Sequence, residues 1–167
     1  MIVIDSEEAE EEDVLLAHSK DHVKSMMKMS DGLKPKQNLY FSTDTYRNMF
    51  TTKAALISAG STVEAVRAVC NNSVDQSFAI VRPPGHHAGR ELRPMKAISN
   101  GFCLLNAAAA AALYAAAPRS QGGLGLKRIC VIDIDLHHGN GTQDILCSTY
   151  DPRFLYVSTH VGGPHIN

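Results

Sequence analysis

Apolar residues follow two different patterns along the chain, one with helical spacing and one in short continuous runs. The helical pattern begins at Val14, and Ser19 is a typical N-cap residue for the segment "KDHVKSMMKM" that follows it. A second apolar stripe, from Thr45 to Val69, predicts one long helix with a weak point at Gly60. We expect Met26 and Met27, which lie on the first stripe, to belong to the core.

Four short apolar runs, rich in β-branched or aromatic residues, predict strands that are covered on both faces. They are "FAIV", "FCLL", "RICVID" and "FLYVST". An alanine-rich helix from Ala107 to Ala117, stopped by Pro118, separates the second run from the third, and a short helix at Gln143 to Cys147 separates the third from the fourth. This alternation predicts an α/β fold with a parallel sheet flanked by helices, in which ligands bind at the carboxyl ends of strands.

The connecting segments suggest how the chain is organised. Residues 1–13 contain the acidic run "SEEAEEED", which indicates a solvated tail or a first helical turn, and residues 14–167 are then expected to form the domain. Loops are predicted at Lys34 to Asn38 and at Asn71 to Gln76. The glycines of "GGLG" precede a strand, so we interpret them as a flexible connection and not as a phosphate-binding loop.

Composition narrows the class of protein. The 167 residues are 44% hydrophobic and 20% charged, with a net charge of -1, so no electrostatic reason exists to expect nucleic-acid binding. The alanine-rich segment is much shorter than the roughly 20 residues that span a bilayer, and no membrane partner is expected. The four cysteines form no CxxC pair, which favours buried, reduced thiols in a protein of the nucleus or the cytoplasm.

Acidic and imidazole side chains follow two of the predicted strands. Asp133, Asp135 and His137 alternate with apolar residues, which in an extended strand would place all three on one face. His86 and His87 follow the stiff segment "VRPPG" at the end of another strand. The oxygen of Asp135 and the nitrogen of His137 suit zinc or another divalent first-row metal, and a catalytic zinc site requires one further protein ligand.

Three longer blocks carry a specific resemblance. "RPPGHHA", "GFCLLN" and "VIDIDLHHGNGTQ", in this order, are similar to the signature blocks of the histone deacetylase family, above all its class II members and the related acetylpolyamine amidohydrolases. "AHSKDHV", "AALISAGSTVEAV" and "FLYVSTH" also resemble that family. The resemblance implies an incomplete arginase/deacetylase-like three-layer α/β fold and zinc-dependent hydrolysis of the acetyl-lysine amide in histones or other proteins.

The resemblance also implies roles for single residues. His86 and His87 would act as general base and as electrostatic or acid partner, with Asp133 oriented toward His86 and Asn140 toward His87. A neutral His86 would accept a proton from water while zinc polarises the acetyl carbonyl. Class I relatives carry Asp at the position of Asn140, so the amide favours class II.

Further roles concern the metal, the substrate channel and a second ion. Asp135 and His137 would be two zinc ligands, and Gly101 and Phe102 would line a tube that grips the lysine side chain. A structural monovalent cation such as K⁺ would be held by five residues, namely Asp133, Asp135, His137, Ser158 and Thr159.

The sequence departs from the family pattern at two places. In the family, the third metal ligand, an aspartate, and a tyrosine that stabilises the oxyanion follow "VSTH", whereas this sequence ends seven residues later at Asn167. We therefore expect this stretch alone to bind zinc weakly and to hydrolyse little or no substrate. The segment from Gly89 to Asn100 is longer than the corresponding loop of close relatives and is expected to reshape the rim of the tube.

Two other functions are compatible with the same residues. One is deacetylation of a polyamine or another small acetylated amine, since composition does not define the tube rim. The other is a non-catalytic remnant or an interaction module that retains the fold. For the deacetylase interpretation, the expected partners are acetylated lysine residues of histones or other proteins and possible corepressor complexes.

Overall fold

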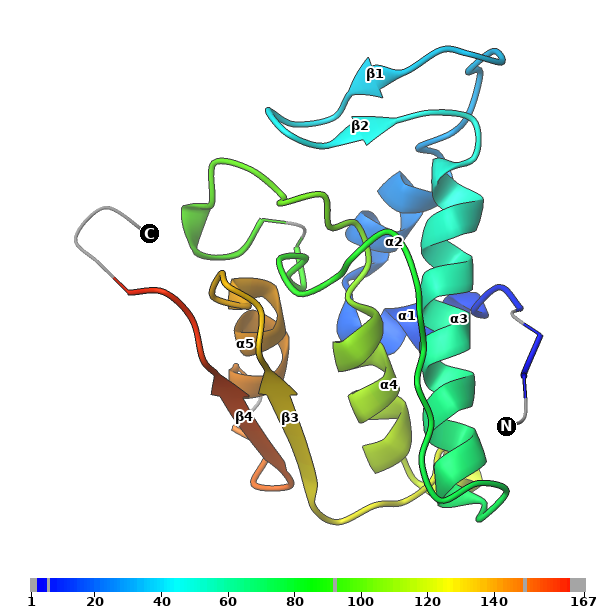
Figure 1. The fold of residues 1–167 in the computed structure, drawn as a ribbon, viewed down its shortest axis with the longest axis vertical. Helices are drawn as coiled ribbons and strands as arrows, with labels where there is room; N and C mark the ends of the chain where they lie inside the picture. Colours follow the sequence, from blue (N-terminus) through cyan, green and yellow to red (C-terminus); the bar gives the residue numbers. More distant parts are fainter. Residues whose placement is uncertain (1–2, 6, 92, 149, 163–167) are drawn as a thin grey trace.

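A computed structural model of the chain describes residues 3–5, 7–91, 93–148 and 150–162. Figure 1 shows the elements in chain order. They are α1 (Glu11–Ala17), α2 (Lys20–Met27), β1 (Leu39–Tyr40), β2 (Tyr46–Arg47), α3 (Thr51–Cys70), the 3-10 turn η1 (Pro94–Lys96), α4 (Ala107–Ala116), the 3-10 turn η2 (Arg119–Gln121), β3 (Ile129–Asp133), α5 (Asn140–Cys147) and β4 (Phe154–Ser158).

The first two helices begin with the signals that their sequences contain. Glu11, Glu12 and Asp13 form the first turn of α1, where negative charge interacts favourably with the helix dipole. Ser19 is the N-cap of α2, and its hydroxyl accepts a hydrogen bond of 3.2 Å from the His22 amide. The predicted cap is confirmed, whereas the boundary of an acidic tail at residue 13 stays a prediction.

Replacing Ser19 with Ala is expected to lower the free energy of unfolding by about 1 kcal/mol, because the first turn of α2 loses its side-chain acceptor. Urea unfolding followed by circular dichroism measures this loss. Ser25, an exposed residue of the same helix, is the matched control, and Ser25→Ala is expected to leave the unfolding midpoint unchanged or raise it slightly. Equal effects of the two substitutions would contradict a capping role.

The long helix begins later than the apolar stripe predicts. α3 starts at Thr51, and the residues before it form an antiparallel hairpin in which Tyr40 pairs with Tyr46. Asn48 explains the late start, because its side chain accepts a hydrogen bond of 2.9 Å from the Phe50 amide and thereby favours a turn over a continued helix. The prediction of helix from Thr45 to Phe50 is therefore wrong, whereas the helix from Thr51 onward is confirmed.

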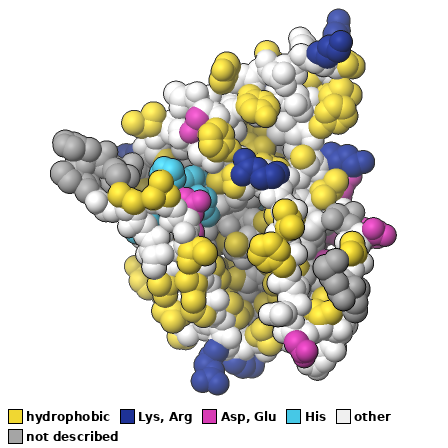
Figure 2. Space-filling view, in the orientation of Figure 1, with side chains coloured by type: hydrophobic (Ala, Val, Ile, Leu, Met, Phe, Trp, Pro, Cys, Tyr) yellow, Lys and Arg dark blue, Asp and Glu magenta, His cyan; other side chains and the backbone are white. Residues whose placement is uncertain are grey.

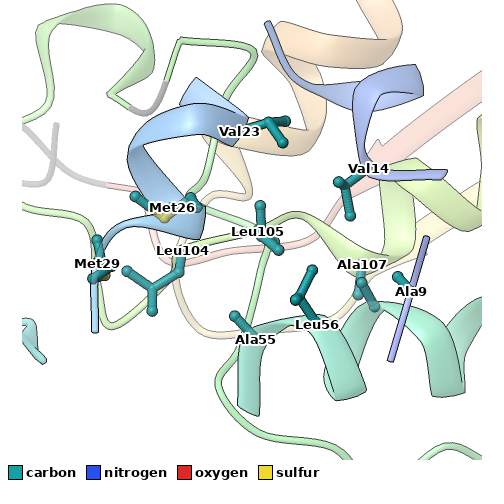
Figure 3. Close-up of a cluster of buried hydrophobic side chains, with 11 residues drawn as sticks. Ala9, Val14, Val23, Met26, Met29, Ala55, Leu56, Leu104, Leu105 and Ala107 are labelled. Atoms are coloured by element: carbon teal, nitrogen blue, oxygen red, sulfur yellow. The ribbon is translucent and has the colours of Figure 1, made fainter. Parts of the chain in front are cut away.

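The core surrounds α4. One cluster of buried side chains lies between α2, α3 and the segment before α4, and Met26 belongs to it with 3% exposure, as predicted (Figure 3). A second cluster joins the alanines of α4 to Ile145 and Leu146 of α5 and to inward side chains of β3 and β4. The small alanine side chains allow close approach of neighbouring elements on both sides of α4.

β3 and β4 form a parallel pair that confirms two of the four predicted strands. Ile129 pairs with Phe154 and Asp133 with Ser158, so the carboxyl ends of both strands lie at the same edge. Burial alternates along each strand, with Ile132 63% exposed and Leu155 58% exposed, so only one face is covered by α4 and α5. The prediction that both faces are covered is therefore wrong for the described residues.

The other two apolar runs do not form strands. Phe78 and Ile80 are each 88% exposed in an extended segment with no ladder partner in the part of the chain that the structure describes. In the run "FCLL", Phe102 is exposed and the other three residues are buried, and the run forms a turn and bends because the carbonyl of Asn100 accepts a hydrogen bond from the Cys103 amide. The four cysteines are free, and Cys130 and Cys147 are exposed, so the prediction of burial is wrong for these two.

Among the described helices, none is both long and apolar enough to span a bilayer.

Candidate active site

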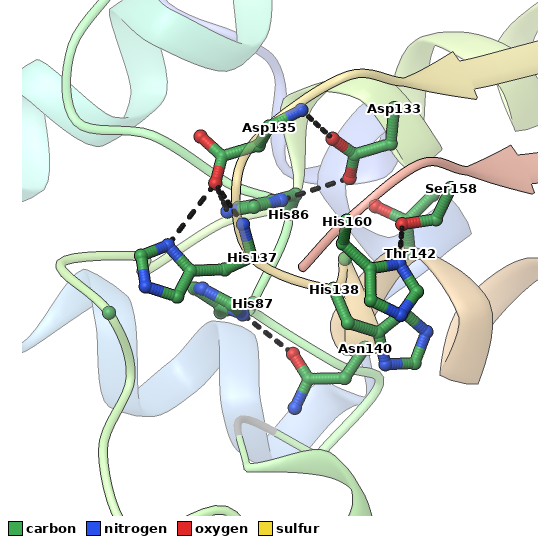
Figure 4. Close-up of polar contacts among 12 residues, drawn as sticks. His86, His87, Asp133, Asp135, His137, His138, Asn140, Thr142, Ser158 and His160 are labelled. Carbon is green, nitrogen blue, oxygen red and sulfur yellow. Dashed lines mark hydrogen bonds and ion pairs between the residues drawn. The ribbon is translucent and has the colours of Figure 1, made fainter. Parts of the chain in front are cut away.

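Two loops bring the candidate site residues together beyond the carboxyl end of β3. His86 and His87 lie in a turn before α4, and Asp135 and His137 lie between β3 and α5 (Figure 4). The strand ends at Asp133, so the prediction that one strand carries all three polar residues is wrong. Carboxylates explain the early end, since Asp133 accepts a hydrogen bond from the Asp135 amide and Asp135 accepts one from the His137 amide.

The two imidazoles are each supported by a different polar group. His86 Nδ1 lies 2.9 Å from Asp133 Oδ2, and His87 Nδ1 lies 2.7 Å from Asn140 Oδ1. Both acceptors require a proton on Nδ1, so in the neutral form each Nε2 is a bare acceptor. The ring centroids of His86 and His87 are 4.1 Å apart, and both imidazoles therefore act in one small volume.

Asp135 and His137 lie beside the two imidazoles. Asp135 Oδ1 is 3.3 Å from His137 Nδ1 and 3.9 Å from His86 Nε2, and the His87 and His137 ring centroids are 6.0 Å apart. The side chain of Asp135 is 50% exposed and that of His137 is 62% exposed, whereas the Asp133 side chain is only 12% exposed. Figure 2 shows histidine and acidic side chains together on this face of the molecule.

Burial and hydrogen bonds set the charges of the site. Burial lowers the pKa of His87, and the neighbouring imidazoles of His86 and His137 lower it further, although the Asn140 contact acts in the opposite direction. The hydrogen bond from the His137 amide lowers the pKa of Asp135 despite some desolvation. At neutral pH, the site therefore combines an uncharged His87 with an ionised carboxylate at position 135.

The residues predicted to line a substrate tube lie next to His87. Gly101 has a φ of +50°, and a Cβ on it would collide with the His87 ring, so only glycine fits. Phe102 follows with a φ of +66° and is 51% exposed, and its amide donates a hydrogen bond of 3.1 Å to Thr45 Oγ1. The side chain of Phe102 is thus exposed next in sequence to the glycine that contacts His87.

The long segment from Gly89 to Asn100 contains the turn η1 and two exposed apolar side chains. Met95 is 58% exposed and Ile98 is 83% exposed. The segment ends immediately before Gly101 and Phe102, which is consistent with a position near the rim of the site.

The residues predicted to hold a monovalent cation lie at the ends of the strand pair. Ser158 is the register partner of Asp133, and its hydroxyl is 2.9 Å from His160 Nδ1. The Thr159 amide donates a hydrogen bond of 2.9 Å to the carbonyl oxygen of Asp133. His138 and His160 stack with ring centroids 4.6 Å apart, a contact that the sequence interpretation did not include.

Tyr156 is a further residue that the sequence interpretation missed. Its hydroxyl donates to the Gly139 carbonyl at 2.9 Å and lies 3.3 Å from Asp133 Oδ2, the same oxygen that faces His86. Desolvation, followed by the charge of Asp133, raises the pKa of the phenol to about 12, so Tyr156 remains a donor. The alternation in "FLYVST" was a usable signal, because it places Tyr156 on the same face as Ser158.

The donor set fits part of a zinc site. Asp135 is an ionised oxygen donor and His137 a nitrogen donor, the combination that zinc accepts. Within the described ranges, no group of three or more His, Cys, Asp and Glu side chains is placed to hold a metal ion. These two residues therefore supply two of the three protein ligands that a catalytic zinc normally has.

Comparison with known proteins identifies the family to which the chain belongs. A model of the histone deacetylase domain matches residues 1–165. The chain belongs to the histone deacetylase family. The resemblance of its sequence blocks to that family is thereby confirmed.

Individual relatives extend this result to the fold. Histone deacetylase 5 of Arabidopsis thaliana is 39% identical over 162 residues, which are 95% of this chain and 23% of that protein. Polyamine deacetylase HDAC10 of Danio rerio is 36% identical over 92% of this chain and 21% of its own length. The crystal structure of the HDA15 HD domain superimposes with a TM-score of 0.78 and 35% identity, over 95% of this chain and 40% of that one.

This member of the histone deacetylase family therefore has the α/β fold of that family and corresponds to only part of its relatives. It spans 23% and 21% of the length of the two curated proteins and 40% of the solved chain. The prediction of an arginase/deacetylase-like α/β fold is confirmed by the structural match.

Proposed function

We propose that this chain contributes to the zinc-dependent hydrolysis of acetyl-lysine amides in histones or other proteins. The observation that carries the proposal is the pair of adjacent imidazoles with unlike supports, a carboxylate behind His86 and an amide behind His87. Family membership and the ionised Asp135 beside His137 support the same chemistry.

The two imidazoles have different tasks in this proposal. His86 accepts a proton from the attacking water at Nε2, and the Asp133 carboxylate stabilises the positive charge that the ring then acquires. His87 has no carboxylate behind it, and in its uncharged form it assists as electrostatic or acid partner of the reacting group. Asn140 fixes its ring orientation, while Gly101 and Phe102 bind the aliphatic part of the lysine.

Asp135 and His137 would hold the zinc ion together with a third protein ligand. When bound, zinc would supply Lewis acidity to the amide carbonyl and to a water molecule. We also propose that a monovalent cation such as K⁺ would stabilise the carboxyl ends of β3 and β4. It would be held by five residues, Asp133, Asp135, His137, Ser158 and Thr159.

Zinc binding to the 167-residue chain is expected to be weak and to depend on both proposed ligands. Asp135→Ala and His137→Ala should each lower the affinity by about tenfold or more, because each removes one of two donors. Titration calorimetry of the chain measures the affinity. Asp151→Ala, at a carboxylate that pairs with Arg153, is the control, and equal affinities of all variants would contradict the assignment.

A small acetylated amine is the second candidate substrate. The name of the Danio rerio relative, polyamine deacetylase, favours this candidate at 36% identity. Comparing kcat/KM of the full-length protein for acetyl-lysine peptides and for acetylpolyamines discriminates the two. Preference for the peptides is the expected result.

Absence of any zinc-dependent turnover by the full-length protein would instead favour a non-catalytic remnant or an interaction module. For the 167-residue chain alone, we propose little or no turnover, because the residues that the structure describes offer two metal donors where a catalytic zinc site requires three. As part of the deacetylase proposal, we propose that the protein acts in the nucleus or the cytoplasm and that a corepressor complex recruits it.

A further inference from the structure

Three fully buried polar side chains lie behind the imidazole pair, and the proposed chemistry uses none of them. They are His18, Asn106 and Thr142, with exposures of 1%, 0% and 1%. They come from three separate parts of the chain, the residue after α1, the N-cap of α4 and the first turn of α5. All three contact the segment that carries His86 and His87, or contact each other.

The amino end of α5 holds the first carbonyl of this segment. His86 O accepts hydrogen bonds from the amides of Gly141 and Thr142, at 2.9 and 3.1 Å. The helix approaches so closely that a Cβ on Gly141 would lie 2.5 Å from the carbonyl carbon of Ala88. The first turn of α5 and the imidazole segment are therefore in direct backbone contact.

Asn106 connects the same segment to α4 and α5. Its side-chain nitrogen donates to the Ala88 carbonyl at 3.1 Å and to Thr142 Oγ1 at 3.0 Å, so both amide protons have acceptors. Its side-chain oxygen accepts from the Ala109 amide at 3.0 Å, which caps α4. One buried amide thus links two helices to the backbone immediately after His87.

His18 completes the network in a single tautomer. Gly89 O, 2.8 Å from Nδ1, can only accept, so Nδ1 carries the proton. The backbone N–H of Asn106 donates a hydrogen bond of 2.9 Å to His18 Nε2, so Nε2 carries no proton. Because the ring is buried and both nitrogens are engaged, neither the other tautomer nor the protonated form fits this position.

We propose that His18, Asn106 and Thr142 are positioning residues that fix the backbone of residues 86–89 and thereby hold the imidazoles of His86 and His87 in register with Asp133 and Asn140. The inference rests on the proposed function, since it treats those two imidazoles as the reacting groups. Three of four successive carbonyls in the segment, at residues 86, 88 and 89, are held by this network or by the α5 amides. A segment fixed in this way keeps its geometry before substrate arrives.

Thr142→Val tests the network with little change of shape. The substitution removes the acceptor for one Asn106 proton, and the Gly141 amide is expected to exchange with solvent about tenfold faster. The imidazole nitrogen resonances of His86 and His87 should shift in the same variant. Thr142→Ser, which keeps the hydroxyl, should restore both. Thr62→Val is the matched control, because Thr62 donates to Ser58 O within α3, away from the site.

Two results would overturn the inference. One is unchanged Gly141 exchange and unchanged His86 and His87 resonances in Thr142→Val, and the other is an equal change in Thr62→Val. If Thr142→Val does not fold, the imidazole nitrogen resonances of the unmodified chain test the inference instead, because the network requires His18 to carry its proton on Nδ1. A proton on Nε2 would overturn it.

Kinetics separate this inference from the proposed function. In the full-length protein, Thr142→Val should lower kcat for an acetyl-lysine peptide and leave KM unchanged, and Thr142→Ser should recover kcat. A native protein without turnover refutes the deacetylase proposal, while the spectra still test the positioning network.

Discussion

His86→Ala is expected to lower kcat of the full-length protein by about 10²–10⁴-fold, the range that a positioned general base contributes. The reason lies in the two faces of the imidazole. Nδ1 donates to Asp133, and Nε2 lies 3.9 Å from Asp135 Oδ1, so the bare nitrogen faces the proposed metal ligands. No other imidazole in the described part of the chain has a carboxylate at Nδ1 and a second carboxylate near Nε2.

Steady-state hydrolysis of an acetyl-lysine peptide measures this effect. KM should change little, because the imidazole acts on the attacking water and does not hold the lysine side chain. His160→Ala is the control, since it removes an exposed imidazole that contacts Ser158 and stacks on His138. A His86→Ala protein with nearly native kcat would refute the base assignment, and a large loss in the control would indicate general damage to this face.

Much of this site follows from the sequence, because short-range patterns determine where its residues lie. Asp133 ends a strand that its apolar run predicts, and "VRPPG" delivers His86 and His87 at the start of a turn. The resemblance to deacetylases indicated which side chains should meet, and the structure contains the contacts of His86 with Asp133 and of His87 with Asn140. The chemical roles of these residues stay predictions.

The sequence was less informative where distant contacts decide the conformation. Short apolar runs rich in β-branched or aromatic residues predicted strands at Phe78 to Val81 and at Phe102 to Leu105, but a strand also needs a partner with free backbone groups. Tyr156 was missed because its role depends on the register of β4 against β3, which brings its hydroxyl to Asp133. His18 was missed for the same reason, since its partners Gly89 and Asn106 lie far away in sequence.

Acid is expected to destabilise the fold through His18. Burial lowers the pKa of this imidazole to about 3, and the neighbouring His22 and Arg90 act in the same direction against the Gly89 hydrogen bond. In the unfolded chain, the imidazole titrates near its ordinary value of 6.5. Between these two values the unfolded state binds a proton that the folded state excludes, so stability is complete above pH 6.5 and falls as the pH falls.

The expected slope is about 1.4 kcal/mol per pH unit for one such group, which amounts to about 2–3 kcal/mol between pH 6.5 and pH 4.5. Urea unfolding of the chain at both values measures it. Carboxylates also titrate in this range, so the decisive quantity is the difference between the native chain and His18→Gln, in which only this imidazole is lost. The variant should be less stable at pH 6.5 and show a shallower decline toward pH 4.5.

Parallel declines of the two proteins would contradict a buried neutral His18. If His18→Gln does not fold, the imidazole signals of the native chain provide the same test, because His18 should remain unprotonated at pH 4.5. The energetic reason is that a proton on Nε2 would face the donating amide of Asn106 in a site without solvent. The fold then loses stability at the backbone segment that carries His86 and His87.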